Sequence, residues 1–180
     1  IENILDNRKS VAAVVWLVRS DYYFPGDSIS KSVEFGEATM GLAGKKSSVE
    51  LAGNIWRDGI RALLGQLNED GIPIVLMHNW PEFPQWPSDC LSQQTMKNCE
   101  ISRSAFLDYR RASFLAEEEA VAGFNHLAVI DPVDSLCSSE VCPMALGLMI
   151  LYRDGNHLTP AGSLRLVPAL REAIKDAMAR

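Results

Sequence analysis

The chain has 180 residues, of which 47% are hydrophobic and 22% are charged, as is ordinary for a folded globular protein. These proportions exclude a disordered or collagen-like chain, and the length suits one domain rather than two. Lys and Arg number 17 against 23 Asp and Glu, so the net charge is -6, and no basic segment interleaved with aromatic residues offsets it. We therefore expect no nucleic-acid partner.

The first expected element is a strand over residues 11–18, where the sequence VAAVVWLV is continuously apolar and rich in β-branched side chains. Such a run is typical of a strand covered on both faces, so we expect a central strand of a parallel sheet. Residues 19–48 are rich in Ser, Gly and Lys and show no sustained period. They predict a long loop of the kind that often carries function.

A helix and a second strand are expected next. From Val49 to Asp70-Gly71 apolar residues recur at three- and four-residue steps, which predicts an amphipathic helix, and residues 72–77 predict a strand. The segment that follows contains three prolines, which exclude regular structure. We expect its aromatic residues to pack, the alternative being a sugar-stacking rim; they are Trp80, Phe83 and Trp86.

Two further helices and one strand complete the expected order. A helix over residues 102–121 would turn residues 117–119, all Glu, toward water; a strand follows at residues 127–130, and a last helix covers residues 160–178. Strands that alternate with helices build a three-layer α/β/α sandwich with a parallel sheet. We therefore predict a single domain of this class over residues 1–180.

The four cysteines fall into two close pairs, Cys90 with Cys99 and Cys137 with Cys142. Close pairs in even number favour two local disulfides, and hence an oxidising compartment such as the periplasm or the cell exterior. Four free thiols in a cytosolic protein are the alternative. A zinc site is a weaker interpretation because the spacings do not match a structural site, so we expect no metal.

Asp154 and His157 are the strongest candidates for catalytic residues. They are three residues apart in a turn made compact by Gly155, before a final helix for which Thr159 is the expected N-cap and Pro160 the first residue. This spacing lets the carboxylate orient one imidazole nitrogen and leaves the other free to act as a base, as in a nucleophilic triad. An ordinary capping turn has the same spacing and is the alternative.

Residues 130–166 resemble the C-terminal end of the SGNH hydrolase-like domain attached to acyltransferase 3 membrane proteins, which O-acylate bacterial surface polysaccharides. The shared features are a Cys pair, a strand, a Tyr-x-Asp-x-x-His-Leu-Ser/Thr loop, a Gly-Ser pair and a Pro-containing helix. Here they are Cys137, Cys142, Tyr152, Asp154, His157, Leu158, Thr159, Gly162, Ser163 and Pro168. More weakly, residues 12–22 look like the family's third strand and residues 72–84 like its fourth.

This resemblance implies a flavodoxin-like sandwich of the SGNH-hydrolase type, with His157 as general base and acid and Asp154 holding its tautomer. It also implies an extracytoplasmic, periplasmic domain of an inner-membrane protein. A membrane acyltransferase domain would deliver the acyl donor, a polysaccharide hydroxyl would accept the acyl group, and no cofactor would be needed.

The sequence departs from the family at two catalytic positions. The family's nucleophilic serine lies in a Gly-Asp-Ser motif directly after the first strand, before the strand matched by residues 12–22. Gly26-Asp27-Ser28 has these letters in a loop, so Ser28 is a weak candidate nucleophile, and we prefer to interpret it as part of a local turn. We therefore expect that the chain lacks the N-terminal strand carrying the nucleophile and is inactive in isolation.

The second departure concerns the oxyanion hole, since the family's Asn donor is absent from residues 16–21. Arg19 is a possible oxyanion or substrate contact there, or else a solvated charge at the end of a strand. Two other functions remain open. One is a stand-alone carbohydrate esterase, and the other is a non-catalytic polysaccharide-binding module that stacks sugars on Tyr22, Tyr23, Trp80 and Trp86.

Overall fold

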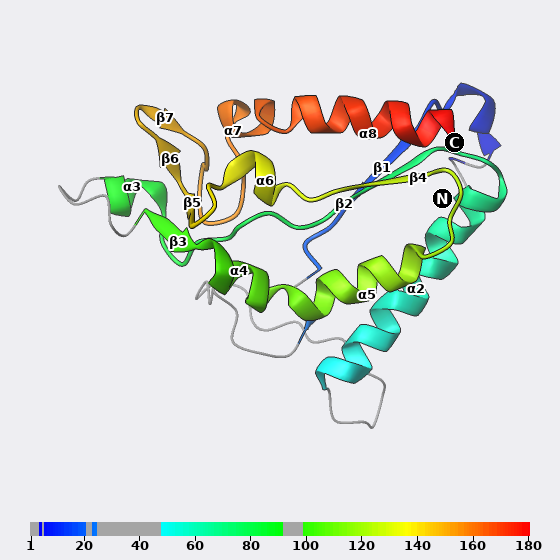
Figure 1. The fold of residues 1–180 in the computed structure, drawn as a ribbon, viewed down its shortest axis with the longest axis horizontal. Coiled ribbons are helices and arrows are strands. Elements are labelled where there is room, and N and C mark those ends of the chain that lie inside the picture. The colour runs from blue at the N-terminus through cyan, green and yellow to red at the C-terminus, as the bar shows by residue number, and fades with distance from the viewer. Residues whose placement is uncertain (1–3, 5, 21–22, 25–47, 92–98) are drawn as a thin grey trace.

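The computed structural model describes residues 4, 6–20, 23–24, 48–91 and 99–180. Among these residues, three parallel strands form the main sheet in the order β1-β2-β4. The strands are β1 (Val14–Leu17), β2 (Ile74–Met77) and β4 (Leu127–Ile130). Helices α2 (Val49–Glu69) and α5 (Arg111–Val121) cover one face and α8 (Val167–Ala179) covers the other, as Figure 1 shows. This arrangement confirms the predicted α/β/α sandwich.

One apolar core lies on each face of the sheet. Ile74 and Leu76 of β2 pack with α2 and α5, whereas Val75 and Met77 pack with α8. Successive side chains of a strand point to opposite faces, so β2 contributes to both cores, and all four of its residues are buried. Of the three strands in this sheet, β2 is the central one.

β1 differs from the prediction that it would be a central strand covered on both faces. Within the described part of the chain it forms an edge of the sheet, and its side chains alternate between half-buried and exposed. Val15 and Leu17 lie level with Val75 and Met77 on the α8 face, yet remain 43% and 42% exposed. The reason is that α8 packs against β2 and β4 and leaves this face of β1 uncovered.

The predicted helices are present, but two of them are broken. α2 begins after the N-cap Ser48, whose hydroxyl accepts a hydrogen bond from the Leu51 N–H at 3.1 Å. The helix expected over residues 102–121 divides at Arg110 into α4 (Arg103–Tyr109) and α5. The last helix divides into α7 (Pro160–Leu164) and α8, because Pro168 in the first turn of α8 has no N–H to continue the helix. No helix in the described ranges is long and apolar enough to span a membrane.

Several short elements gather beyond the carboxyl ends of the sheet strands, at the left of Figure 1. They are α3 (Pro87–Leu91), β3 (Glu100–Ser102), α6 (Val133–Leu136), β5 (Val141–Pro143), β6 (Ala145–Leu146) and β7 (Met149–Ile150). β3 pairs antiparallel with β5, and β6 with β7 around Gly147, whose φ of 59° is left-handed. In open α/β sheets this edge is where ligands bind.

Candidate active site

The loop from β7 to α7 carries the two candidate catalytic side chains and is closed at its base. Tyr152 and Leu158 form an isolated antiparallel bridge, and the Arg153 N–H donates to the His157 carbonyl at 2.8 Å. Thr159 accepts a hydrogen bond from the Gly162 N–H at 3.1 Å, so it is the N-cap that the sequence predicts, with Pro160 at the first helical position. The loop is thus held between a strand and a helix.

Within this loop the Asp154 carboxylate contacts the imidazole of His157. Nδ1 of His157 lies 2.9 Å from Oδ2 and 3.0 Å from Oδ1 of Asp154. Oδ1 also accepts the backbone N–H groups of Asn156 at 3.0 Å and His157 at 2.8 Å. Asp154 therefore both closes the turn and orients the ring, and the two interpretations of the spacing are combined in one side chain.

The electrostatics of the pair suit an orienting carboxylate. Partial burial by itself raises the pKa of Asp154, but the hydrogen bonds from the backbone of Asn156 and His157 and from the imidazole outweigh it, so the net pKa is lowered. Asp154 is then ionised at neutral pH. The His157 side chain is 61% exposed, and none of the described residues bonds its Nε2. That nitrogen is available to take a proton from a neighbouring hydroxyl.

The segment after β2 holds the loop in place through two hydrogen bonds. The Trp80 indole N–H donates to the Asn156 carbonyl at 2.7 Å, and the Phe83 N–H donates to the Gly155 carbonyl at 2.7 Å. The approach is so close that a Cβ on Gly155 would lie 2.6 Å from the Phe83 carbonyl oxygen. Phe83 also packs its ring edge against Tyr152, at 4.7 Å between centroids. The aromatic residues of this segment thus have a role that the sequence analysis did not assign.

The remaining candidate residues are Arg19, Ser28 and the four cysteines. Arg19 follows β1 and forms an ion pair with the buried Glu82, so it is not simply a solvated charge at a strand end. Ser28 lies outside the described residues. The four cysteines form two disulfides, Cys90–Cys99 and Cys137–Cys142, which confirms the predicted pairing and excludes them as zinc ligands. No group of three or more potential metal ligands occurs in the described part of the chain.

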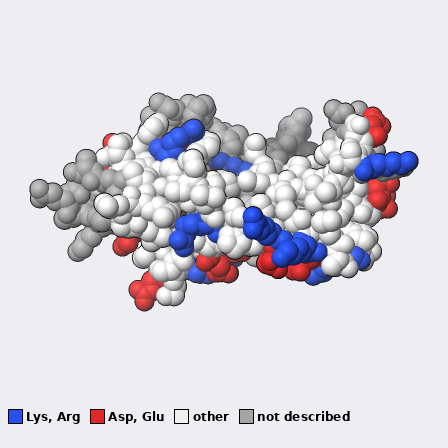
Figure 2. All heavy atoms as spheres, turned by 90° about the horizontal axis from the view of Figure 1, so that it is seen from above, with Lys and Arg blue, Asp and Glu red and all other residues white. Residues whose placement is uncertain are grey.

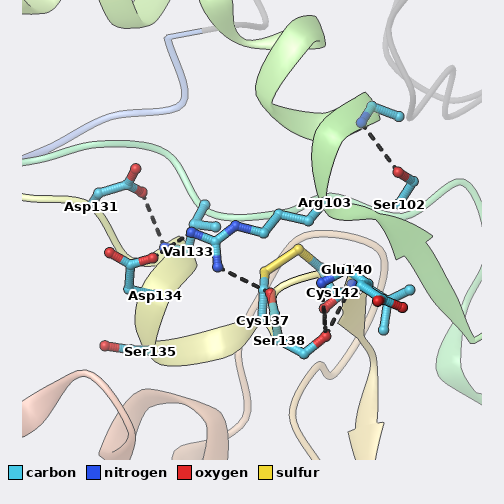
Figure 3. Close-up of a disulfide and its surroundings, with 12 residues drawn as sticks. Ser102, Arg103, Asp131, Val133, Asp134, Ser135, Cys137, Ser138, Glu140 and Cys142 are labelled. Carbon is cyan, nitrogen blue, oxygen red and sulfur yellow. Dashed lines mark hydrogen bonds and ion pairs between the residues drawn. A yellow bond between two sulfur atoms is a disulfide. The ribbon is translucent and has the colours of Figure 1, made fainter.

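Figure 3 shows how the Cys137–Cys142 disulfide joins the end of α6 to β5. The guanidinium of Arg103 points into the same turn and donates to the Ser138 carbonyl at 3.0 Å. The hydroxyl of Ser138 accepts the N–H groups of Glu140 and Val141. The disulfide thus cross-links two of the short elements near the site. Disulfides are typical of proteins in oxidising compartments.

The aromatic residues expected to pack or to stack on sugars behave differently from one another. Phe83 is buried and Trp80 is half-buried, but Trp86 is 59% exposed, so packing was right for two of the three. Tyr23 stacks on Trp56 at 5.5 Å between centroids, and Tyr22 lies outside the described residues. Of the described side chains considered for sugar stacking, Trp86 is therefore the most exposed.

One acidic residue is buried against the prediction that residues 117–119 face water. Glu117 is only 2% exposed, because its carboxylate contacts Nδ1 of the buried His78 at 2.6 Å. Glu118 contacts Nε2 of the same ring at 2.7 Å, while Glu119 remains exposed. Helical period alone cannot reveal a charge that is buried by a partner 39 residues away.

The described residues thus form a parallel α/β sandwich in which Asp154 contacts His157 in the loop between β7 and α7. The model of the family described as "SGNH domain (fused to AT3 domains)" matches residues 1–172 of this chain. The chain therefore belongs to the family of SGNH domains fused to AT3 domains and is an acyltransferase-associated domain. No curated protein and no solved structure gives a significant match.

Proposed function

We propose that the domain transfers an acyl group, which we take to be acetyl, to a hydroxyl of a bacterial cell-surface polysaccharide. In this proposal it is the periplasmic part of an inner-membrane acyltransferase, whose membrane domain delivers the acyl donor. The observation that carries the proposal is the 2.9 Å contact between Asp154 and Nδ1 of His157, whose side chain is 61% exposed and whose Nε2 is bonded by none of the described residues. Membership of a family fused to AT3 domains and the two disulfides support the compartment.

In the proposed reaction His157 acts first as a base and then as an acid. Nε2 removes the proton of a serine hydroxyl, which attacks the donor carbonyl and forms an acyl-serine as the donor's leaving group takes the proton back. The acceptor sugar hydroxyl then gives its proton to Nε2 and attacks the acyl-serine, and serine regains the proton. Asp154 keeps the ring in the required tautomer and stabilises the imidazolium formed in each half.

We further propose that this serine lies on an additional strand that precedes the chain and pairs with β1, on the side where the described residues place no neighbouring strand. Two observations support this placement: β1 is an edge strand among the described residues, and the apolar side chains of Val15 and Leu17 on its α8 side are 43% and 42% exposed. Figure 2 views the molecule from the α8 side, where uncharged residues form much of the surface and charged side chains lie mainly along the lower margin, with others at the right-hand end and the upper left. A parallel strand packed there would place a serine that follows it at the carboxyl ends of the sheet strands, where the loop with His157 also lies.

The test is acylation by the complete protein carrying His157→Ala or Asp154→Ala. We expect the acetyl content of the polysaccharide to fall toward the background, since loss of the orienting carboxylate slows serine proteases on the order of 10⁴-fold. The melting temperature should change little for His157→Ala, and should fall modestly for Asp154→Ala, which also removes the acceptor of the Asn156 and His157 N–H groups. Ser48→Ala is the matched control, because it removes the cap of α2, costs about 1 kcal/mol and lies outside the site. Full acylation by the His157 variant would refute the proposal.

A further inference from the structure

Arg19 and Glu82 form an ion pair that connects the end of β1 to the segment after β2. One terminal nitrogen of Arg19 donates a hydrogen bond to one carboxylate oxygen of Glu82, and Nε forms an ion-pair contact with the other oxygen, so two guanidinium nitrogens engage both oxygens. The Glu82 side chain is 2% exposed and that of Arg19 is 29% exposed. A bidentate guanidinium–carboxylate pair fixes orientation as well as distance, and Lys cannot reproduce its geometry.

Glu82 lies between the two residues that clamp the catalytic loop. Trp80 bonds the Asn156 carbonyl and Phe83 bonds the Gly155 carbonyl, so residues on both sides of Glu82 touch the turn that joins Asp154 to His157. Glu82 is also close to the base of the loop, because its charge adds to burial in raising the pKa of the Tyr152 hydroxyl. A movement of Glu82 would therefore be passed to the loop by two hydrogen bonds.

We propose that Glu82, held by Arg19, is a positioning residue that sets the place of the Asp154–His157 pair for acyl transfer. This rests on the proposed function. Arg19 follows β1, the strand beside which the serine is proposed to lie, and Glu82 belongs to the segment that holds the imidazole. The ion pair thus fixes the spacing between nucleophile and base, where a displacement of 1 Å can cost about 10²-fold in rate.

The competing explanation is that the Arg19–Glu82 pair only stabilises the fold. A variant that keeps stability but removes both charges separates this explanation from a positioning role. Replacing a buried ion pair by apolar residues of similar size often leaves stability unchanged or raises it. The double variant Arg19→Met with Glu82→Leu should therefore stay folded but lose the geometry that the two charges impose. If the pair serves only stability, this variant should transfer acyl groups as fast as the wild type.

The experiment compares Glu82→Gln, Arg19→Lys and the double variant in the complete protein. We expect kcat to fall by about 10²-fold for Glu82→Gln and the double variant, with KM for the acceptor unchanged and a smaller loss for Arg19→Lys. Asp134→Asn is the control for loss of an arginine–carboxylate pair away from the loop, since it breaks the more exposed Arg103–Asp134 pair next to the Cys137–Cys142 disulfide. The control should keep the wild-type kcat.

A second measurement, the NMR signal of the His157 Nδ1 proton, follows the imidazole without requiring turnover. We expect this signal to shift in Glu82→Gln and to stay in place in Asp134→Asn, because only the former disturbs the contact with Asp154. An unchanged signal, or a kcat that falls only with the folded fraction, would overturn the inference. A wild type without acyl transfer would refute the proposed function, and the signal would still decide whether Glu82 positions His157.

Discussion

Gly155 is the residue at which the catalytic loop and the segment after β2 come closest. Its carbonyl accepts the Phe83 N–H, and a Cβ at this position would lie 2.6 Å from the Phe83 carbonyl oxygen. Backbone cannot yield as a flexible side chain can, so a methyl group must push the loop away. Glycine at position 155 therefore permits the close contact between the loop and the segment after β2. Any residue with a Cβ would disturb that contact.

Gly155→Ala should consequently separate the loop from its clamp. We expect acyl transfer by the complete protein to fall by about 10²-fold, since His157 is displaced while its chemistry is kept. The control is Gly59→Ala, because Gly59 lies in α2 with open space around its Cβ position, and Ala there should stabilise the helix by about 0.5–1 kcal/mol. Wild-type rates in Gly155→Ala, measured with the acceptor saturating, would contradict this account of the loop.

At the scale of elements, His78 joins the end of β2 to α5. Both ring nitrogens contact carboxylates, Glu117 at 2.6 Å and Glu118 at 2.7 Å, and the ring packs on Phe114 at 4.3 Å between centroids. Burial lowers the pKa of His78, but the hydrogen bonds and charges of the two carboxylates outweigh it, and the net pKa is raised above 6.5. The protonated ring is thus the form that the fold stabilises.

The sign of the pH dependence follows from that direction. Because the folded pKa lies above the unfolded value, the stabilisation is fully present below pH 6.5 and is lost as the pH rises through the folded pKa. We expect the free energy of unfolding, measured by urea denaturation, to decrease as the pH rises from 6.5 through the folded pKa. Glu117→Gln should flatten the decrease, whereas Glu119→Gln, at an exposed position, should preserve it. A decrease that is unaffected by Glu117→Gln would contradict the role of His78.

Helices α2, α4 and α5 show which features of the fold can be predicted from sequence patterns. α2 was predicted because its apolar side chains repeat with the helical period over 21 residues and a left-handed glycine follows it. The break between α4 and α5 was not, because it occurs at Arg110, which is drawn inward to Asp131 and to the Asn79 carbonyl. Partners so distant in the chain leave no periodic signal, and the same holds for Glu117 and for the pair of Arg19 with Glu82.

At the scale of the whole molecule, the layered architecture and the Asp-His loop were predictable for different reasons. The alternation of apolar strands and amphipathic helices is a local pattern, and it leads to a parallel sheet between helices. The loop was predicted from spacing and family resemblance, which identify residue types but not the clamp formed by Trp80 and Phe83. The position of β1 at the described edge was not predictable, because an apolar run does not show how many strands flank it.

The proposed function requires that Asp154 and His157 activate a serine on a strand beside β1, outside the described residues. A fluorophosphonate reacts covalently with a serine only when a neighbouring base activates it, and peptide mapping then identifies that serine. In the complete protein we predict one labelled serine upstream of Ile1, with labelling abolished by His157→Ala and strongly reduced by Asp154→Ala. The 180-residue chain alone should remain unlabelled. Labelling of Ser28, or labelling that persists in His157→Ala, would contradict the account.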